Sequence, residues 1–144
     1  MKKLLFPLAF ALLALTSCDN EKVLDETNLP GQAKEFIEAH YPDAVVNRVI
    51  RDRDDLQTSY EVILDNQAQL EFDRTGECYS VEGGGNAKIP DSIIPTKVLE
   101  YVNENYAGEF VTEWEKDKTT QEVKLSSRKE LVFNLSGTFL RIDN

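Results

Sequence analysis

The sequence contains an internal repeat, and this feature limits the possible folds more than any other. Residues 29–81 match residues 94–142, at an offset of 65 residues in the first part of the unit and 61 in the second. The identical pairs are Pro30 with Pro95, Glu35 with Glu100, Tyr41 with Tyr106, Val46 with Val111, Asp52 with Asp117, Glu61 with Glu122, Val62 with Val123, Leu64 with Leu125, Leu70 with Leu131, Phe72 with Phe133 and Gly76 with Gly137. Because self-similarity identifies the structural unit before any helix or strand is assigned, we expect two copies of one supersecondary unit.

Each unit is predicted to open with an amphipathic helix. Pro30 and Pro95 suit the first helical turn, because no backbone donor is lost there. The residues with helical spacing are Ala33, Phe36, Ile37, His40 and Tyr41 in the first unit and Val98, Tyr101, Val102, Asn105 and Tyr106 in the second. Pro42 and Gly108 are expected to end these helices.

Strand-like runs separated by turn residues follow each helix. They cover residues 45–52, 60–65, 69–73 and 77–81, and then 110–117, 121–126, 130–135 and 138–142. The short connections between them indicate antiparallel hairpins. The predicted fold is therefore α+β, with two tandem α-β-β-β-β repeats over residues 29–82 and 94–144. Its antiparallel sheet carries the helices on one face and leaves the other face largely in water.

The segment between the two units begins with Gly83-Gly84-Gly85-Asn86. Its composition predicts a flexible, Gly-rich linker over residues 83–93. A phosphate-binding loop would need a following Lys-Ser or Lys-Thr pair at a helix start, and none follows here. Within this segment, Asp91-Ser92-Ile93 resembles a bacterial O-glycosylation acceptor.

The N-terminus has the features of a secretory signal peptide. Lys2 and Lys3 precede an apolar run over residues 4–15. The sequence Leu15-Thr16-Ser17-Cys18 resembles the lipobox of bacterial lipoproteins, in which the cysteine is acylated and the leader is cut before it. This resemblance implies a leader over 1–17 and a lipid anchor at Cys18, on the periplasmic or outer-membrane surface of a Gram-negative cell envelope. The alternative is an ordinary secretory leader that is followed by a cysteine.

Residues 18–28 are acidic and lack apolar periodicity, so they are predicted to form a tether. The whole chain has 26 Asp and Glu residues against 16 Lys and Arg, and its net charge is -10. Nucleic acid is therefore not expected as a partner, because binding to phosphates needs clustered cations. Anionic lipid headgroups would also repel this surface, so membrane attachment is expected to come from the lipid alone.

The mature chain resembles the PepSY-like family of secreted bacterial proteins, which is also described as similar to the beta-lactamase inhibitor protein fold. The residues that carry the resemblance are the paired openings Leu29-Pro30 and Ile94-Pro95, the helix ends His40-Tyr41-Pro42 and Asn105-Tyr106-Ala107, and the closing patterns Leu70-Glu71-Phe72-Asp73-Arg74-Thr75-Gly76 and Leu131-Val132-Phe133-Asn134-Leu135-Ser136-Gly137. The resemblance implies a two-repeat protein of the cell envelope that binds or inhibits another protein. The family defines no catalytic residues that could be carried over.

The aromatic residues Trp114, Phe110 and Tyr79 are the candidate protein-binding residues. Trp114 is the only tryptophan, and on the open sheet face it could act as an aromatic anchor for a partner. In the alternative that we favour, Phe110 and Trp114 fill the core between helix and sheet, as Val45 and Val49 would in the first unit. Tyr79 has the same two interpretations.

The remaining polar candidates have simpler interpretations. One His and two Cys leave little material for a zinc site or a thiol–imidazole pair, and no cofactor or metal is expected. His40 is predicted to make a local hydrogen bond at a helix end, and Cys78 to be a small apolar filler. Asp52 cannot open an EF-hand loop, because Gln57 and Ile63 occupy its sixth and twelfth positions.

The acidic cluster Asp52, Asp54 and Asp55 is accordingly interpreted as a solvated hairpin tip. Glu113, Glu115 and Glu122 could provide paired carboxylates for glycoside hydrolysis, but such pairs arise freely in so acidic a chain. The leading hypothesis is a non-enzymatic, lipid-anchored envelope protein that binds another, unidentified envelope protein. The alternative is a small-ligand or glycan binding or sensing lipoprotein that uses a groove between the two units.

Overall fold

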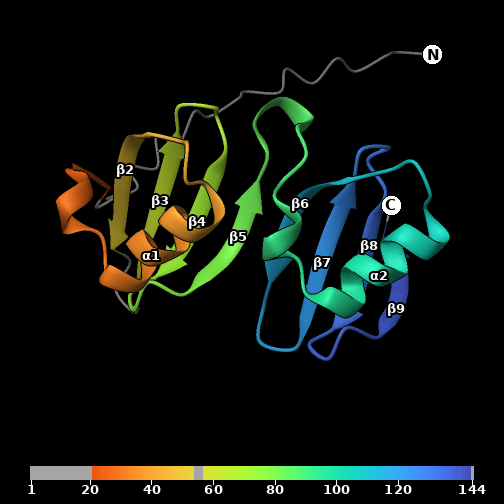
Figure 1. Ribbon diagram of the computed structural model, residues 1–144. Helices are drawn as coiled ribbons and strands as arrows, with labels where there is room; N and C mark the ends of the chain where they lie inside the picture. Colours follow the sequence, from red (N-terminus) through yellow and green to blue (C-terminus); the bar gives the residue numbers. More distant parts are fainter. Residues whose placement is uncertain (1–20, 54–56, 144) are drawn as a thin grey trace, which may run out of the picture.

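The computed structural model describes residues 21–53 and 57–143, so the predicted leader and Cys18 lie outside the described residues. In these ranges the chain forms one antiparallel sheet of nine strands, whose order in space is their order in the sequence (Figure 1). The strands are β1 (Lys22–Leu24), β2 (Val46–Arg53), β3 (Thr58–Leu64), β4 (Gln69–Asp73), β5 (Cys78–Glu82), β6 (Val111–Lys116), β7 (Thr120–Leu125), β8 (Glu130–Asn134) and β9 (Phe139–Asp143). The predicted α+β class is confirmed, and β2 to β9 lie within two residues of the predicted runs.

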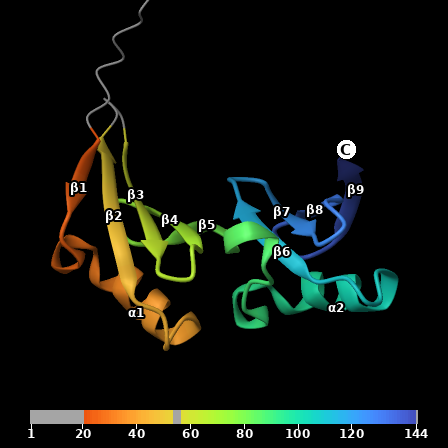
Figure 2. The same cartoon turned by 90° about the horizontal axis from the view of Figure 1, so that it is seen from above.

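Two helices, α1 (Gly31–His40) and α2 (Thr96–Asn105), lie on the same side of the sheet (Figure 2). Each begins directly after a proline, Pro30 or Pro95. Each ends where the backbone N–H of Tyr41 or Tyr106 donates to the carbonyl oxygen four residues earlier, at 2.8 Å. Their buried residues belong to the apolar stripes that the sequence pattern predicts.

Apolar side chains oppose one another across the helix-covered face of the sheet. The row of cross-strand partners runs through Val49, Val62, Leu70, Val81, Trp114, Val123 and Leu131, all of which are buried. Phe36 of α1 meets Phe72 edge-on at 5.7 Å between ring centroids, and Tyr101 of α2 meets Phe133 in the same way at 5.4 Å. Because each buried side chain of this size contributes roughly 1.5–3 kcal/mol, this layer is the main source of stability.

The turns that follow β4 and β8 share one hydrogen-bonding pattern. The side-chain Oδ1 of Asp73 accepts from the backbone amides two and four residues ahead, at 2.8 and 3.0 Å. Asn134 does the same at 3.1 and 2.8 Å. Gly76 and Gly137 then take φ values of +93° and +86°, which favour glycine. The two units thus close with the same local geometry.

The segment between the units is packed, which differs from the flexible linker predicted over residues 83–93. The backbone amides of Gly83 and Ile89 donate to carbonyl oxygens of β6 at 2.8 and 3.0 Å, and Ile89 is buried. A Cβ on Gly84 would lie 2.6 Å from the carbonyl oxygen of Asn66. Glycine composition suggested freedom of the chain, but here glycine permits a close approach of two backbones.

The predicted acidic tether over residues 18–28 contains a strand, which corrects that prediction for its C-terminal part. Strand β1 pairs antiparallel with β2, with Lys22 opposite Arg51 and Leu24 opposite Val49. A short 3-10 helix (Glu26–Asn28) follows. A run of three residues is too short to show the period-2 pattern of a strand, so the sequence pattern gave no sign of β1.

We predict that Gly76→Ala lowers the free energy of unfolding more than Gly108→Ala does. Both glycines have φ near +90°, so either substitution should cost about 1–3 kcal/mol of backbone strain. A Cβ at Gly76 would also lie 2.8 Å from the backbone nitrogen of Ala33, whereas nothing lies within 4 Å at Gly108. The additional overpacking should cost about 1–3 kcal/mol. Urea unfolding of both variants measures the difference, and equal losses would contradict docking of this turn on α1.

Candidate binding face of the sheet

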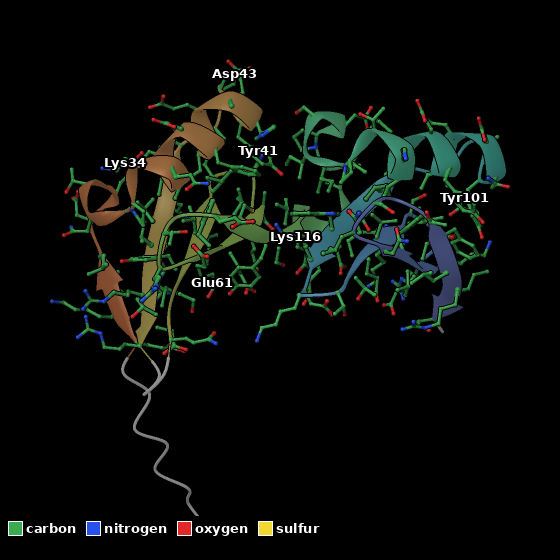
Figure 3. All side chains as sticks on the ribbon, turned by 90° about the horizontal axis from the view of Figure 1, so that it is seen from below. Lys34, Tyr41, Asp43, Glu61, Tyr101 and Lys116 are labelled. Carbon is green, nitrogen blue, oxygen red and sulfur yellow. The ribbon has the colours of Figure 1, made fainter. Side chains whose placement is uncertain are left out.

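The face of the sheet opposite the helices is polar, and it brings glutamates of neighbouring strands directly opposite one another. The opposed pairs are Glu61 with Glu71, Glu82 with Glu113, and Glu115 with Glu122. In Figure 3, Glu61 lies on the side of the sheet away from both helices. We call this surface, defined by these six glutamates together with Tyr79, the open face.

Two of the opposed glutamates, Glu61 and Glu122, have a raised pKa, and the opposition of like charges costs stability. Burial raises the pKa of Glu61, and the neighbouring Glu71 raises it further. Burial also raises the pKa of Glu122, with additional repulsion from nearby carboxylates that include Glu115. Like charges at directly opposite positions of a sheet are destabilising. These glutamates are therefore not explained by stability of the fold.

One glutamate of the open face has a cationic partner. Lys124 Nζ lies 2.9 Å from Glu113 Oε1 and 3.9 Å from Glu130 Oε1. Within residues 21–53 and 57–143, the other five glutamates of the open face form no salt bridge. The open face therefore carries an excess of negative charge that is available to a cationic partner.

Tyr79 occupies a β-bulge near the centre of this face. Glu71 pairs with Ser80, and the next residue, Phe72, pairs with Cys78, so Tyr79 is the extra residue of the ladder. Bulges redirect side chains and are frequent beside functional sites. Burial raises the pKa of the Tyr79 hydroxyl, and its hydrogen bond to the Glu71 carboxylate raises it further. The hydroxyl therefore stays protonated and can donate a hydrogen bond.

Two hollows adjoin Tyr79. A cleft of about 460 Å³ lies on the side where β5 and β6 diverge, and Lys116 and Lys118 contribute to its walls. The Lys116 ammonium forms an ion pair with Glu77 in this cleft. A smaller hollow of about 150 Å³ lies on the other side and includes Glu61 among its lining residues. Tyr79 is thus an aromatic side chain between two depressions of a polar surface.

Trp114 is a core residue and not an anchor on the open face. It is 7 % exposed, on the helix-covered face, and its Nε1–H donates to Gln121 Oε1 at 3.2 Å. Its candidate role as a protein-binding residue is therefore corrected, because no partner can reach its ring in this structure. The physical reason is the apolar row, in which Trp114 lies between Val81 and Val123.

Phe110 does not share the environment of Trp114, although alternation along a strand would place both residues on one face. A bulge between Val111 and Glu113 shifts the register, so Val111 and Trp114 are both buried and Phe110 is 38 % exposed. The first unit behaves in the same way, with Val45 exposed and Val49 buried. Phe110 remains an accessible aromatic candidate.

The other sequence candidates have structural positions. His40 Nδ1 lies 2.8 Å from the hydroxyl of Ser92, so its partner is in the segment between the units. Cys78 is buried, and burial raises the pKa of its thiol to about 12, as suits a small filler. Asp52 is exposed, while Asp54 and Asp55 lie outside the described residues. In residues 21–53 and 57–143, no group of three or more His, Cys, Asp or Glu side chains is arranged to hold a metal ion.

Sequence reasoning missed the opposition of the glutamates. Period-2 alternation places Glu61 and Glu71 on the face away from the core, but it does not say which residues face each other. Register depends on turn length and on bulges. The short connection between β3 and β4, residues 65–68, was the available signal, since a short hairpin loop fixes the pairing of its strands.

Comparison with known proteins agrees with this architecture. The sequence model of a family described as "Putative beta-lactamase-inhibitor-like, PepSY-like" matches residues 14–76 and 58–141. The chain belongs to this family. No curated protein matches the chain. Within the described residues, no helix has the length and apolar character needed to cross a membrane.

Three solved structures from Bacteroides are similar over nearly their whole length. One, from Bacteroides thetaiotaomicron, is described as a "putative calcium-regulated periplasmic protein"; it is 38% identical, with 86% of this chain and 97% of that chain covered and a TM-score of 0.82. A periplasmic protein of Bacteroides vulgatus, described as putative and of the DUF2874 family, is 33% identical, with 88% and 99% covered and a TM-score of 0.82. A second Bacteroides vulgatus protein, described as putative, periplasmic and of unknown function, is 28% identical, with 86% and 99% covered and a TM-score of 0.81.

We predict that Trp114→Ala lowers the free energy of unfolding by about 3–5 kcal/mol, as expected for removal of a large aromatic side chain from a core. Trp114→Phe keeps a ring in the apolar row and should cost less. Chemical unfolding followed by circular dichroism measures both variants. If Trp114→Ala left the unfolding midpoint unchanged, the core position of this residue would be wrong.

A second prediction concerns the pH dependence of stability. Because the folded-state pKa of Glu122 lies above its ordinary value of 4.5, the folded protein binds more protons than the unfolded chain between the two values. The free energy of unfolding therefore falls as pH rises from the ordinary pKa of this group to its folded-state pKa. Glu122→Gln should raise the free energy of unfolding by about 0.2–1 kcal/mol at pH 7. The gain should disappear below the ordinary pKa.

The matched control is Glu113→Gln, since Glu113 is opposed by a glutamate but also has Lys124 as a partner. This substitution should give no gain, or a loss of up to about 1 kcal/mol, because it removes an ion pair. Urea unfolding between pH 4 and pH 8 distinguishes the two variants. Equal gains at pH 7 would show that repulsion at Glu122 is not specific to that site.

Proposed function

We propose that this protein is a non-catalytic periplasmic module that binds another envelope protein through the open face of its sheet. The observation that carries this proposal is the asymmetry of the sheet. Both described helices cover one face, while the other holds opposed glutamates that cost stability. Because the opposed glutamates lower the stability of the fold, their presence is best explained by a contact with another molecule.

The partner surface is proposed to be basic. A lysine or arginine placed between two opposed glutamates would relieve their repulsion and gain a charge-assisted hydrogen bond. The net charge of -10 would also steer a cationic partner toward the chain and accelerate association. Arginine is the more effective choice, because its planar group can contact two carboxylates at once.

Tyr79 is proposed as the central anchor of the contact. Tyrosines are frequent among residues that dominate binding energy, especially near the centre of an interface. Its position between two hollows allows partner side chains to pack on either side of it. Phe110, at the start of β6, would lie toward the rim of the same contact.

The proposed location is the periplasm of a Gram-negative bacterium, and it is supported by the similar Bacteroides proteins described as periplasmic. We further propose that Cys18 is acylated after removal of residues 1–17, so that the module is held at a membrane by lipid. Attachment would then need no membrane-spanning helix. The family description suggests an inhibitor-like module, so an envelope hydrolase is the first class of partner to test.

We predict that the double variant Glu82→Lys with Glu115→Lys loses the partner. Both residues are exposed on the open face, and charge reversal would repel a basic surface. The matched control is Glu100→Lys with Glu104→Lys, which makes the same change of charge on the exposed side of α2. Crosslinking in the native envelope followed by pull-down should recover one enriched protein with the wild type and the control. Recovery should fall at least tenfold with the open-face variant.

Equal recovery with both double variants would contradict binding through the open face, provided that thermal unfolding shows both to be folded.

The second candidate function is small-ligand or glycan binding in the cleft of about 460 Å³ beside Tyr79. It is favoured by the position of this cleft between the two units. A thermal shift with envelope sugars and metabolites tests it, because a ligand bound by the folded state raises the unfolding temperature. A shift without a protein partner would support this second candidate.

A further inference from the structure

The internal repeat makes β9 the counterpart of β5. At the offset of 61 residues, Arg141, Ile142 and Asp143 match Ser80, Val81 and Glu82. Both strands also follow a bulge at matching positions, where Tyr79 and Leu140 are the extra residues. The two strands therefore correspond residue by residue and contain the same type of irregularity.

Their outer edges differ in one respect. Residues Ser80 to Glu82 pair antiparallel with β6, and Val81, opposite Trp114, is fully buried. Strand β9 lies at the end of the sheet, and no strand of the described ranges pairs with its outer side (Figure 1). Its counterpart residue Ile142 is 44 % exposed. The edge that β6 covers in the first unit is thus uncovered in the second.

An uncovered edge of this kind is a template for another strand. It presents unpaired backbone amides and carbonyls, and natural edges are usually protected by charges or by short length. Here Leu140 and Ile142 are both exposed, in a strand of only five residues. The three pairs that join β5 to β6 show that a short ladder is sufficient in this fold.

We propose that β9 pairs antiparallel with β9 of a second copy of this chain, across a two-fold axis at Ile142. In this register Ile142 faces its own counterpart on the helix-covered side. Arg141 of each copy faces Asp143 of the other on the open side. A closed, two-fold contact of this kind is the commonest arrangement in homo-oligomers.

Charge decides this register. In the structure Arg141 is already paired with Asp143 of the same strand, at 2.8 Å between Nε and Oδ1. Moving the axis by one residue, to Arg141, would place the two Arg141 side chains opposite each other and expose both to repulsion. The axis at Ile142 gives two opposite-charge pairs and one apolar pair.

The test is crosslinking of the full chain in its native envelope. Ile142→Cys should give a crosslinked species of twice the monomer mass with a short bis-maleimide, because the two introduced thiols lie directly opposite each other. Wild-type protein controls for the native cysteines, and Val23→Cys places a thiol at a more exposed position on β1, the other edge of the sheet. Both controls should stay monomeric.

The register is tested in the Ile142→Cys background. Arg141→Asp should lower the crosslinked fraction about tenfold, because it places like charges opposite each other at both pairs. The exchange Arg141→Asp with Asp143→Arg should restore it, and thermal unfolding confirms that these surface variants fold. The proposal is overturned if Ile142→Cys gives no dimer band or if the exchange does not restore it. It is equally overturned if Val23→Cys crosslinks as well, since that outcome indicates crosslinking that is not specific to the β9 edge.

Discussion

Three residue pairs between β5 and β6 hold the two repeats in one sheet. Val81 and Trp114 are the central pair, and both lie in the apolar row under the helices. The backbone of the connecting segment strengthens the joint, since Gly83 and Ile89 donate to β6. A unit of about 50 residues buries so small a share of its surface that it would be only marginally stable alone. Each unit therefore depends on this short ladder to continue its core into the other.

The regular elements of the fold could be predicted because the repeat, the helical spacing and the period-2 alternation agree with one another. The positions that could not be predicted depend on irregularities. One bulge at the start of β6 separates Phe110 from Trp114, and a simple alternation cannot include it. In the same way, Gly84 was interpreted from composition, whereas its close approach to Asn66 depends on two segments distant in sequence. The acidic character of the open face was visible in the sequence, but the opposition of its glutamates required the register.

The two faces of the sheet follow different physical rules. On the helix-covered face the row of cross-strand pairs from Val49 to Leu131 is apolar and adds to stability. On the open face three cross-strand pairs are glutamate against glutamate, and only Glu113 has a described cationic partner. Such an arrangement is expected where a surface is adapted to a contact at the expense of the isolated molecule. Duplication of one unit produces both faces, because it extends the core on one side of the sheet and the polar surface on the other.

The order of the strands has a consequence for biogenesis. From β1 to β9, each strand pairs with the one that directly precedes it in the chain. A polypeptide that folds from its N-terminus onward can therefore add each strand after β1 to an edge that already exists. Contacts between neighbours in sequence form quickly, because little chain must be closed into a loop. Each new strand covers the edge left by the strand before it, and this limits the surface on which newly made chains could aggregate.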